Sequence, residues 1–147
     1  MSSPEAFPPV EALVPHRGPS LLIERVLGRS EDGLEVVGRI PLANAFVAGG
    51  MAPGFVGIEL AAQAAAALEA LDRQRGSPGA GPQLGYIVGI REARFDLAGI
   101  PAGQELWAHV RLVGGASTLA TYELQVRHDG ASCLSAVVST FRPREAR

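Results

Sequence analysis

The sequence predicts an α+β domain in which a mostly antiparallel, curved sheet of about six strands wraps around one long buried helix. Residues 53–74 are rich in alanine and apolar on nearly every side, and the segments before and after them are strand-like and joined by short turns. Short turns cannot make the crossovers that parallel strands require. The 147 residues, 47% of them hydrophobic and 19% charged, suffice for one core, so we expect a single domain over 1–147.

The amino-terminal part is expected to form an irregular arm followed by a hairpin. Residues 4–19 hold five of the eleven prolines and predict an arm with one short helical turn. Leu21–Leu27 and Leu34–Ile40 have the composition of strands, and Ser30–Gly33 between them is typical of a turn. These segments predict the first two strands of the sheet.

A helix over about residues 53–74 is the next element. Pro53 is tolerated in a first helical turn, alanine is the best helix former, and Arg73–Gly76 is typical of a helix end. The alanines let other backbone approach closely, as it must when a sheet surrounds a helix. Glu59 and Gln63 interrupt the apolar run, so we do not expect a membrane span.

Four strand-like segments follow the helix. Asp129-Gly130 is a strong hairpin turn, and Gly114–Ser117 indicates a second one. Trp107 lies on the polar face of an alternating strand, which is typical of a surface that a second copy of the chain covers. The four predicted strands are Leu84–Phe95, Gln104–Val113, Thr118–His128 and Ala131–Phe141.

Charge and cysteine content restrict the partners and the compartment. The net charge of −2 provides no basic field, so neither nucleic acid nor a membrane surface is expected as a partner. Cys133 is the only cysteine, which excludes an intrachain disulfide and fits a reducing compartment. The first residues lack the basic and apolar features of a secretory signal. The sequence therefore predicts a cytoplasmic protein.

Glu59 is the first candidate for a chemical role. It lies on the apolar part of the predicted helix, and Gln63 lies four residues on, on the same face. A carboxylate there is costly unless it has a partner or a cavity with water, which is the setting of a general acid or base. The alternative is that Glu59 merely points outward, favoured by the positive end of the helix dipole.

The glycine-rich segment before the helix and the three histidines are weaker candidates. Backbone amides after Ala48–Gly54 could hold an oxyanion, although the same composition is also an ordinary helix start. His16 is interpreted as a loop histidine with a local hydrogen bond, and His109 and His128 as surface residues. Because no two histidines have metal-ligand spacing, neither a metal nor a cofactor is expected.

Three separated motifs resemble, in order and spacing, a known enzyme family. The runs are Leu13–Val26, Pro53–Gln63 and Gly89–Phe95, and the similarity covers about residues 10–143. They resemble the 3-hydroxyacyl-acyl carrier protein dehydratases of the hotdog superfamily. The short form of the helix motif looks more like the dehydratase-like subunits of aryl-polyene-type lipid clusters.

The resemblance implies a hotdog fold, an edge-to-edge dimer and acyl-thioester sites at the dimer interface. In that family a histidine from one protomer and a helix glutamate from the other eliminate water from a 3-hydroxyacyl thioester. Glu59 matches the glutamate and Gln63 the glutamine one turn later. The family's helix-start amide, which binds the thioester carbonyl, falls at Gly54, Phe55 or Val56. The implied substrate is a thioester of acyl carrier protein or coenzyme A in fatty acid or polyene lipid biosynthesis.

The sequence departs from the family at the catalytic histidine. That histidine belongs to a His-Phe-Pro-Gly loop before the helix, whereas 44–53 here is shorter and contains no histidine. Asp96–Gly99 also replaces a basic run that follows the third motif in many dehydratases. We therefore expect a weak or partner-dependent lyase.

Two further functions are compatible with the sequence. One is a non-catalytic partner subunit, in a homodimer or in a heterodimer with a related, histidine-bearing hotdog subunit. The other is an acyl thioesterase in which Glu59 activates water, because one fold can host both reactions.

Overall fold

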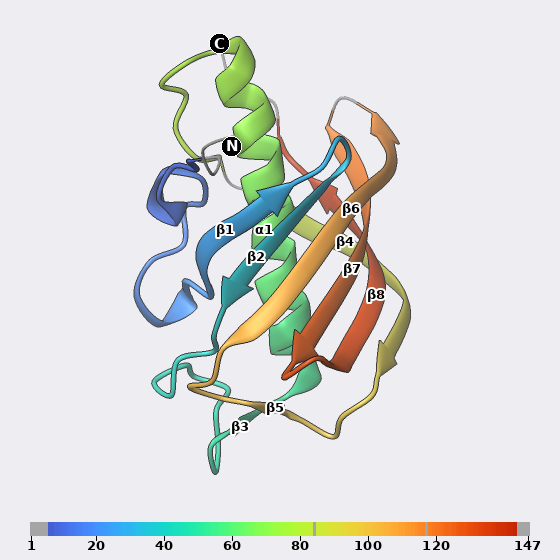
Figure 1. Cartoon of the computed structure of the whole chain (residues 1–147). Coiled ribbons are helices and arrows are strands. Elements are labelled where there is room, and N and C mark those ends of the chain that lie inside the picture. Colours follow the sequence, from blue (N-terminus) through green and yellow to red (C-terminus); the bar gives the residue numbers. More distant parts are fainter. Residues whose placement is uncertain (1–5, 84, 117, 144–147) are drawn as a thin grey trace, which may run out of the picture.

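A computed structural model describes residues 6–83, 85–116 and 118–143 (Figure 1). Its elements are η1 Val10–Ala12, η2 Gly18–Ser20, β1 Ile23–Arg29, β2 Gly33–Gly38, β3 Met51–Ala52, α1 Gly54–Gly76, β4 Tyr86–Phe95, β5 Ile100–Pro101, β6 Leu106–Ala116, β7 Leu119–His128 and β8 Ala131–Phe141. The six longer strands form one sheet in the order β1-β2-β6-β7-β8-β4, with every neighbouring pair antiparallel. The predicted α+β architecture of six strands around one helix is confirmed.

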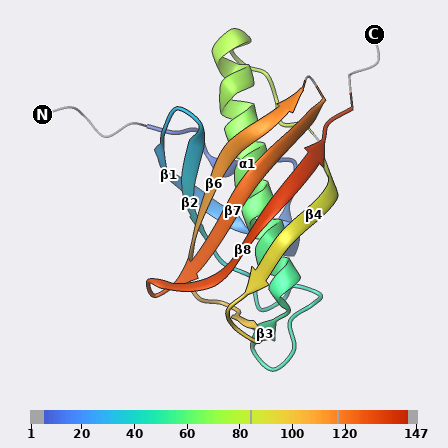
Figure 2. The same cartoon turned by 90° about the vertical axis from the view of Figure 1, so that its right-hand side faces the viewer.

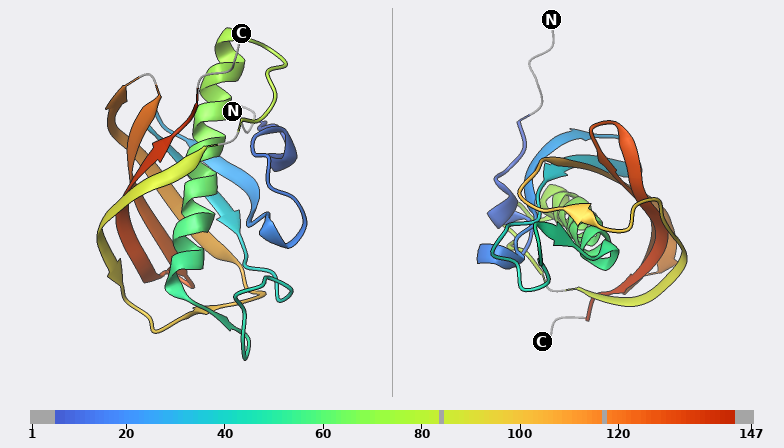
Figure 3. Two further views of the ribbon diagram at one scale, coloured as in Figure 1. Left: turned by 180° about the vertical axis from the view of Figure 1, so that it is seen from behind. Right: turned by 90° about the horizontal axis from the view of Figure 1, so that it is seen from below.

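The sheet curls around α1, as the view along the helix in Figure 3 shows. Figure 2 shows the strands side by side in front of the helix. Helix and sheet meet closely at Gly57, where an added Cβ would lie 2.4 Å from Ile100 Cδ1 and 2.7 Å from Leu134 Cδ2. A buried glycine and a run of alanines at this interface allow the strands to approach the helix backbone.

One side of α1 is not covered by the sheet. Seen from behind in Figure 3, the arm that carries η1 and η2 lies on one side of this uncovered face and β4 lies on the other. Val10, Leu13 and Val14 anchor the arm in the core, with at most 3% of each side chain exposed. The fold therefore places the arm and the edge strand β4 on either side of the uncovered helix face.

The structure differs from the sequence prediction at element ends and in short elements. The arm contains two 3-10 turns rather than one, and the two-residue strands β3 and β5 pair with each other outside the main sheet. β1 begins at Ile23, two residues later than predicted, and the backbone N–H of Leu22 just before it donates to a helix side chain. Gly114 and Gly115 lie in β6 and pair with Thr121 and Ala120 of β7, rather than forming the predicted hairpin turn. Leu84 and Ser117, at two predicted boundaries, lie outside the described residues.

Helix α1 is also long and apolar enough, by length and composition alone, to cross a membrane. However, 61% of its most apolar stretch of 18 residues is buried inside the protein. The helix thus packs as the core helix of the curved sheet.

Candidate active site

A cavity of about 410 Å³ lies on the uncovered face of α1. The helix contributes residues spaced three or four apart, which lie on one face, and the arm, β4 and the end of β8 complete the wall. Most of the lining is apolar, so the cavity suits a hydrocarbon chain with a small number of polar contacts. The helix residues that line it are Phe55, Ile58, Glu59, Ala62, Gln63, Ala66 and Glu69.

Glu59 lies half-buried on the wall of this cavity. Ile58 and Ala62, its apolar neighbours on the helix, share the same wall. The carboxylate is therefore neither sealed in the core nor fully exposed to solvent. A carboxyl group at the edge of an apolar cavity can exchange protons with a bound molecule.

Gln63 connects the helix to the arm. Its Oε1 accepts the backbone N–H of Leu22 at 2.9 Å and that of Ile23 at 3.4 Å, while its Nε2 donates to the Ser20 carbonyl at 2.7 Å. The side chain is only 1% exposed. Because the amide oxygen and the amide nitrogen both bind backbone atoms, Gln63 holds the arm against the helix. Contact between Gln63 and a substrate stays a prediction.

The arm brings His16 into the same cavity as Glu59. His16 lies in a loop, as interpreted, but its Nδ1 is buried without a partner among the described residues, so the expected local hydrogen bond is not formed at that nitrogen. Burial lowers the pKa of His16, the Glu59 carboxylate raises it in part, and Arg17 lowers it further. The first of the three motifs contained this histidine, but its distance from Glu59 along the chain concealed their proximity.

At the helix start, only one of the three predicted thioester-binding residues lines the cavity. The Phe55 side chain lines the cavity, whereas Gly54 and Val56 do not belong to its wall. Val56 is 1% exposed and its backbone N–H donates to the Pro53 carbonyl at 3.0 Å. An added Cβ at Gly54 would lie 2.4 Å from Phe95 Cδ1, so close packing requires the glycine. A thioester-binding amide at 54–56 stays a prediction.

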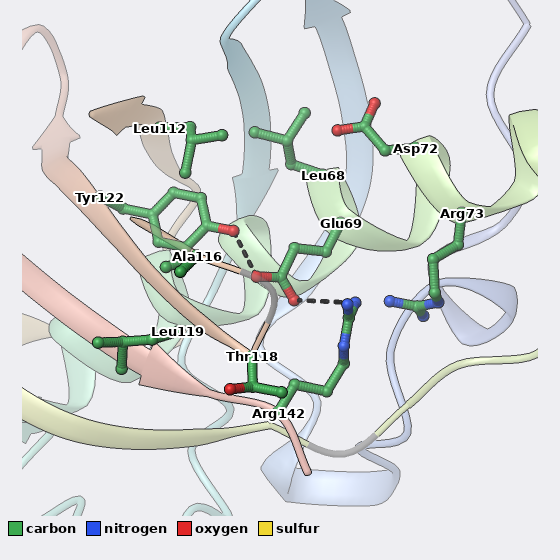
Figure 4. Close-up of a pocket in the computed structure, with 11 residues that line it drawn as sticks. Leu68, Glu69, Asp72, Arg73, Leu112, Ala116, Thr118, Leu119, Tyr122 and Arg142 are labelled. Atoms are coloured by element: carbon green, nitrogen blue, oxygen red, sulfur yellow. Dashed lines mark hydrogen bonds and ion pairs between the residues drawn. The ribbon is translucent and has the colours of Figure 1, made fainter. Parts of the chain in front are cut away.

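A polar cluster lies at the far end of the cavity and borders a second hollow of about 360 Å³ (Figure 4). There the Tyr122 hydroxyl donates to Glu69 Oε1 at 2.5 Å, and Arg142 Nη1 lies 3.7 Å from Glu69 Oε2. Burial, followed by the hydrogen bond to Glu69, raises the pKa of Tyr122 well above its usual range. Glu69 and Arg142 line both hollows, so their ion pair separates the two.

The other histidines lie away from the cavity. His109 stacks on Trp107 with ring centroids 6.0 Å apart, and His128 contacts Gln104 Oε1 at 2.6 Å. Among the described residues, no group of three or more histidine, cysteine, aspartate or glutamate side chains could hold a metal ion. The titratable side chains that line the cavity are His16, Glu59, Glu69, Tyr86 and Arg142.

The fold and the sequence relatives define the class of protein as hotdog dehydratase-like. The chain is 29% identical over 136 residues to the 3-hydroxyacyl-acyl-carrier-protein dehydratase FabZ of Brucella ovis, covering 88% of this chain and 83% of that protein. It is 26% identical over 135 residues to FabZ of Streptococcus pyogenes, covering 88% and 93%. Residues 8–147 match the family model of ApeP-like dehydratases, described as ApeP dehydratase. The chain belongs to the ApeP-like dehydratase family, and the predicted resemblance is confirmed.

Solved structures show the same fold. The dehydratase heterocomplex ApeI:P from Xenorhabdus doucetiae superposes with a TM-score of 0.84 at 22% identity, covering 95% of this chain and 94% of that chain. A hypothetical thioesterase protein with coenzyme A from Streptococcus pneumoniae superposes with a TM-score of 0.57 at 12% identity, covering 84% and 88%. At these identities the structures establish the architecture alone.

Proposed function

We propose that this protein eliminates water from 3-hydroxyacyl thioesters in fatty acid or polyene lipid biosynthesis. The observation that carries the proposal is the half-buried Glu59 on the wall of an apolar cavity, in a member of the ApeP-like dehydratase family. The acyl chain would lie along the apolar helix face, with its C2 and C3 atoms near the carboxyl group. A thioester of acyl carrier protein or of coenzyme A would enter from the open side.

In this proposal Glu59 is the acid that protonates the departing hydroxyl group. Its position on a long buried helix holds it rigidly, which favours a proton transfer that depends on geometry. Backbone amides at Gly54 and Phe55 would polarise the thioester carbonyl, whereas that of Val56 already donates to the Pro53 carbonyl. Gln63 would hold the arm over the substrate. Such donors stabilise the negative charge that develops on the carbonyl oxygen.

The exposed edge strand β4 supports an assembly of two hotdog subunits. In the sheet, β4 pairs only with β8, and all ten of its residues are exposed. The large hydrophobic side chains among them are Tyr86, Ile87, Val88, Ile90 and Phe95. An unpaired edge with exposed apolar side chains is a template for pairing with another strand. We propose that β4 pairs with its equivalent in a second copy or in a related subunit; the similar ApeI:P dehydratase of Xenorhabdus doucetiae is itself a heterocomplex.

The proposed reaction is expected to be slow in the isolated chain unless another residue of the chain replaces the family's loop histidine. Residues 44–53 contain no histidine. A missing general base can cost about 10²- to 10⁴-fold in rate. A histidine-bearing hotdog subunit encoded nearby would raise the rate on mixing.

Conversion of a 3-hydroxyacyl thioester by the purified protein tests this proposal. Enoyl thioester absorbance should appear with the wild-type chain and should fall by about 10²-fold or more in Glu59→Gln, which keeps the shape but removes the acid. Glu105→Gln, just before β6 and outside the cavity, serves as the matched control. Release of free thiol without enoyl product would indicate a thioesterase instead. If neither enoyl thioester nor free thiol forms, with or without a histidine-bearing subunit, the protein has no catalytic role in these reactions.

A further inference from the structure

We propose that His16 replaces the missing loop histidine and is the base that removes the C2 proton, acting together with Glu59 of the same chain. This inference rests on the proposed dehydration and assigns a second catalytic residue to it. The observation behind it is that the arm places the imidazole in the wall of the cavity that holds Glu59.

The arm is held firmly enough to position a catalytic group. On one side of His16, Val14 and Leu13 are fully buried, with 0% and 1% exposed. On the other side, Gln63 binds the backbone of Ser20 and Leu22. Both ends of the histidine segment are thus fastened to the core and to α1.

Arg17 stabilises the arm by hydrogen bonds to its backbone. Its guanidinium donates to the carbonyl of Val14 at 2.8 Å, to that of His16 at 2.6 Å and to that of Glu11 at 2.7 Å. These bonds fix the backbone on which the imidazole is mounted. A rotamer that is set by its surroundings favours proton transfer at a defined distance.

The imidazole also lacks the partner that a structural histidine normally has. Buried side-chain nitrogens are usually hydrogen-bonded, yet His16 Nδ1 is buried and unpartnered within the described part of the chain. In the proposal Nε2, the other ring nitrogen, meets the substrate, because Nδ1 is enclosed and His16 lines the cavity.

The electrostatic surroundings favour the neutral, basic form of the ring. Burial, followed in smaller measure by Arg17, lowers the pKa of His16 against the opposing effect of the Glu59 carboxylate. The imidazole is therefore uncharged near neutral pH and can accept a proton.

The reaction balances with these two groups alone. His16 Nε2 takes the C2 proton, and the electron pair of the C2–H bond forms the C2–C3 double bond. The C3–O bond breaks, and the departing hydroxyl takes the proton of the Glu59 carboxylic acid and leaves as water. The imidazolium then returns its proton to the Glu59 carboxylate, which restores both groups.

Steady-state kinetics of the chain without any other subunit test the inference. With 3-hydroxybutyryl-coenzyme A as the probe, His16→Gln should lower kcat by about 10²- to 10⁴-fold with little change in KM. Added imidazole should restore part of the rate of His16→Gly but none of the rate of Glu59→Gln. His109→Gln, a histidine outside the cavity, should keep the wild-type rate.

The outcomes separate this inference from the proposed function. One outcome is that the wild type is active, that Glu59→Gln is inactive and that His16→Gln keeps the wild-type rate within a few-fold. In that case His16 is not the base, but the proposed dehydration stands. Activity that appears only with a histidine-bearing subunit leads to the same conclusion. If neither the chain nor the mixture dehydrates the probe, both proposals fail.

A measurement without substrate tests the pairing itself. The imidazole signals of His16, followed by NMR through a pH titration, should show a lower pKa in Glu59→Gln than in the wild type, because the carboxylate favours the charged ring. Glu35→Gln, on β2, should leave the pKa unchanged. An equal pKa in Glu59→Gln and wild type would contradict the pairing, whether or not the variants are active.

Discussion

Individual side chains in this protein have roles that depend on their immediate surroundings. Tyr122 is 1% exposed, yet its hydroxyl reaches Glu69 at the border between two hollows. Gln63 is equally buried, but its amide bonds to the backbone of the arm. Polar groups of this kind are costly to bury and are stabilising only when they are bonded.

Tyr122→Phe should destabilise the protein by about 1–3 kcal/mol at neutral pH, because it removes a buried hydrogen bond to a carboxylate. The folded state raises the pKa of Tyr122 above its ordinary value of 10.0, so the folded chain keeps a proton that the unfolded chain loses. The wild type should therefore lose stability as the pH rises above about 10, and this slope should be smaller in Tyr122→Phe. Urea unfolding at several pH values measures both effects.

Tyr86→Phe is the matched control, since Tyr86 is 50% exposed. It should change the free energy of unfolding by less than about 0.5 kcal/mol. Equal alkaline slopes in the wild type and Tyr122→Phe would show that the buried phenol is not responsible for the pH dependence.

At the scale of elements, the connection between α1 and the arm organises the cavity. The helix provides the wall, the arm contributes His16, and the amide of Gln63 fastens one to the other. This connection is also where β1 starts later than its apolar pattern indicated. A local pattern predicts which residues are strand-like, but it gives the ends of an element only to within a residue or two.

Gln63→Met should loosen the arm, because a side chain of similar size leaves the Leu22 N–H and the Ser20 carbonyl without their partner. Each buried group left unsatisfied costs about 1–3 kcal/mol. Amide hydrogens of residues 10–23 should exchange faster in the variant than in the wild type, and dehydration should slow with them. Hydrogen exchange followed by mass spectrometry measures the change.

Gln125→Met, on the sheet and outside the cavity, serves as the control. Unchanged protection of the arm in Gln63→Met would mean that the apolar anchors of the arm hold it without the amide.

At the scale of the whole molecule, the exposed edge strand and the open cavity lie on the same side. β4 contributes Tyr86, Ile87 and Ile90 to the cavity wall, so a subunit that pairs with β4 would lie beside the cavity. The outer face of the sheet has different features, with Trp107 stacked on His109 and Arg127 5.1 Å from the Trp107 ring. We therefore assign the proposed dimer contact to β4 rather than to the Trp107 face. The sequence had indicated both, the face by its alternating pattern and an edge-to-edge contact by the family resemblance.

Val88→Lys should weaken this association, because it places an ammonium group on an apolar edge where Val88 is 57% exposed. Light scattering of the wild type should give about twice the 15.3 kDa of one chain, and the variant should approach the mass of a single chain. Leu27→Lys, at a residue that is 43% exposed on the opposite edge strand, should remain a dimer. If Val88→Lys keeps the wild-type mass, the subunits meet elsewhere.

Sequence alone determined the class of fold, the long alanine-rich helix and the family, because these follow from local composition and from motifs of contiguous residues. It also singled out Glu59. It did not reveal β3 and β5, since two residues are too few to show a pattern. Only the tertiary structure decided that His16 shares a cavity with Glu59 and that Gln63 binds the arm. Those contacts join segments more than 40 residues apart, and no local pattern encodes which of many polar side chains will meet across the fold.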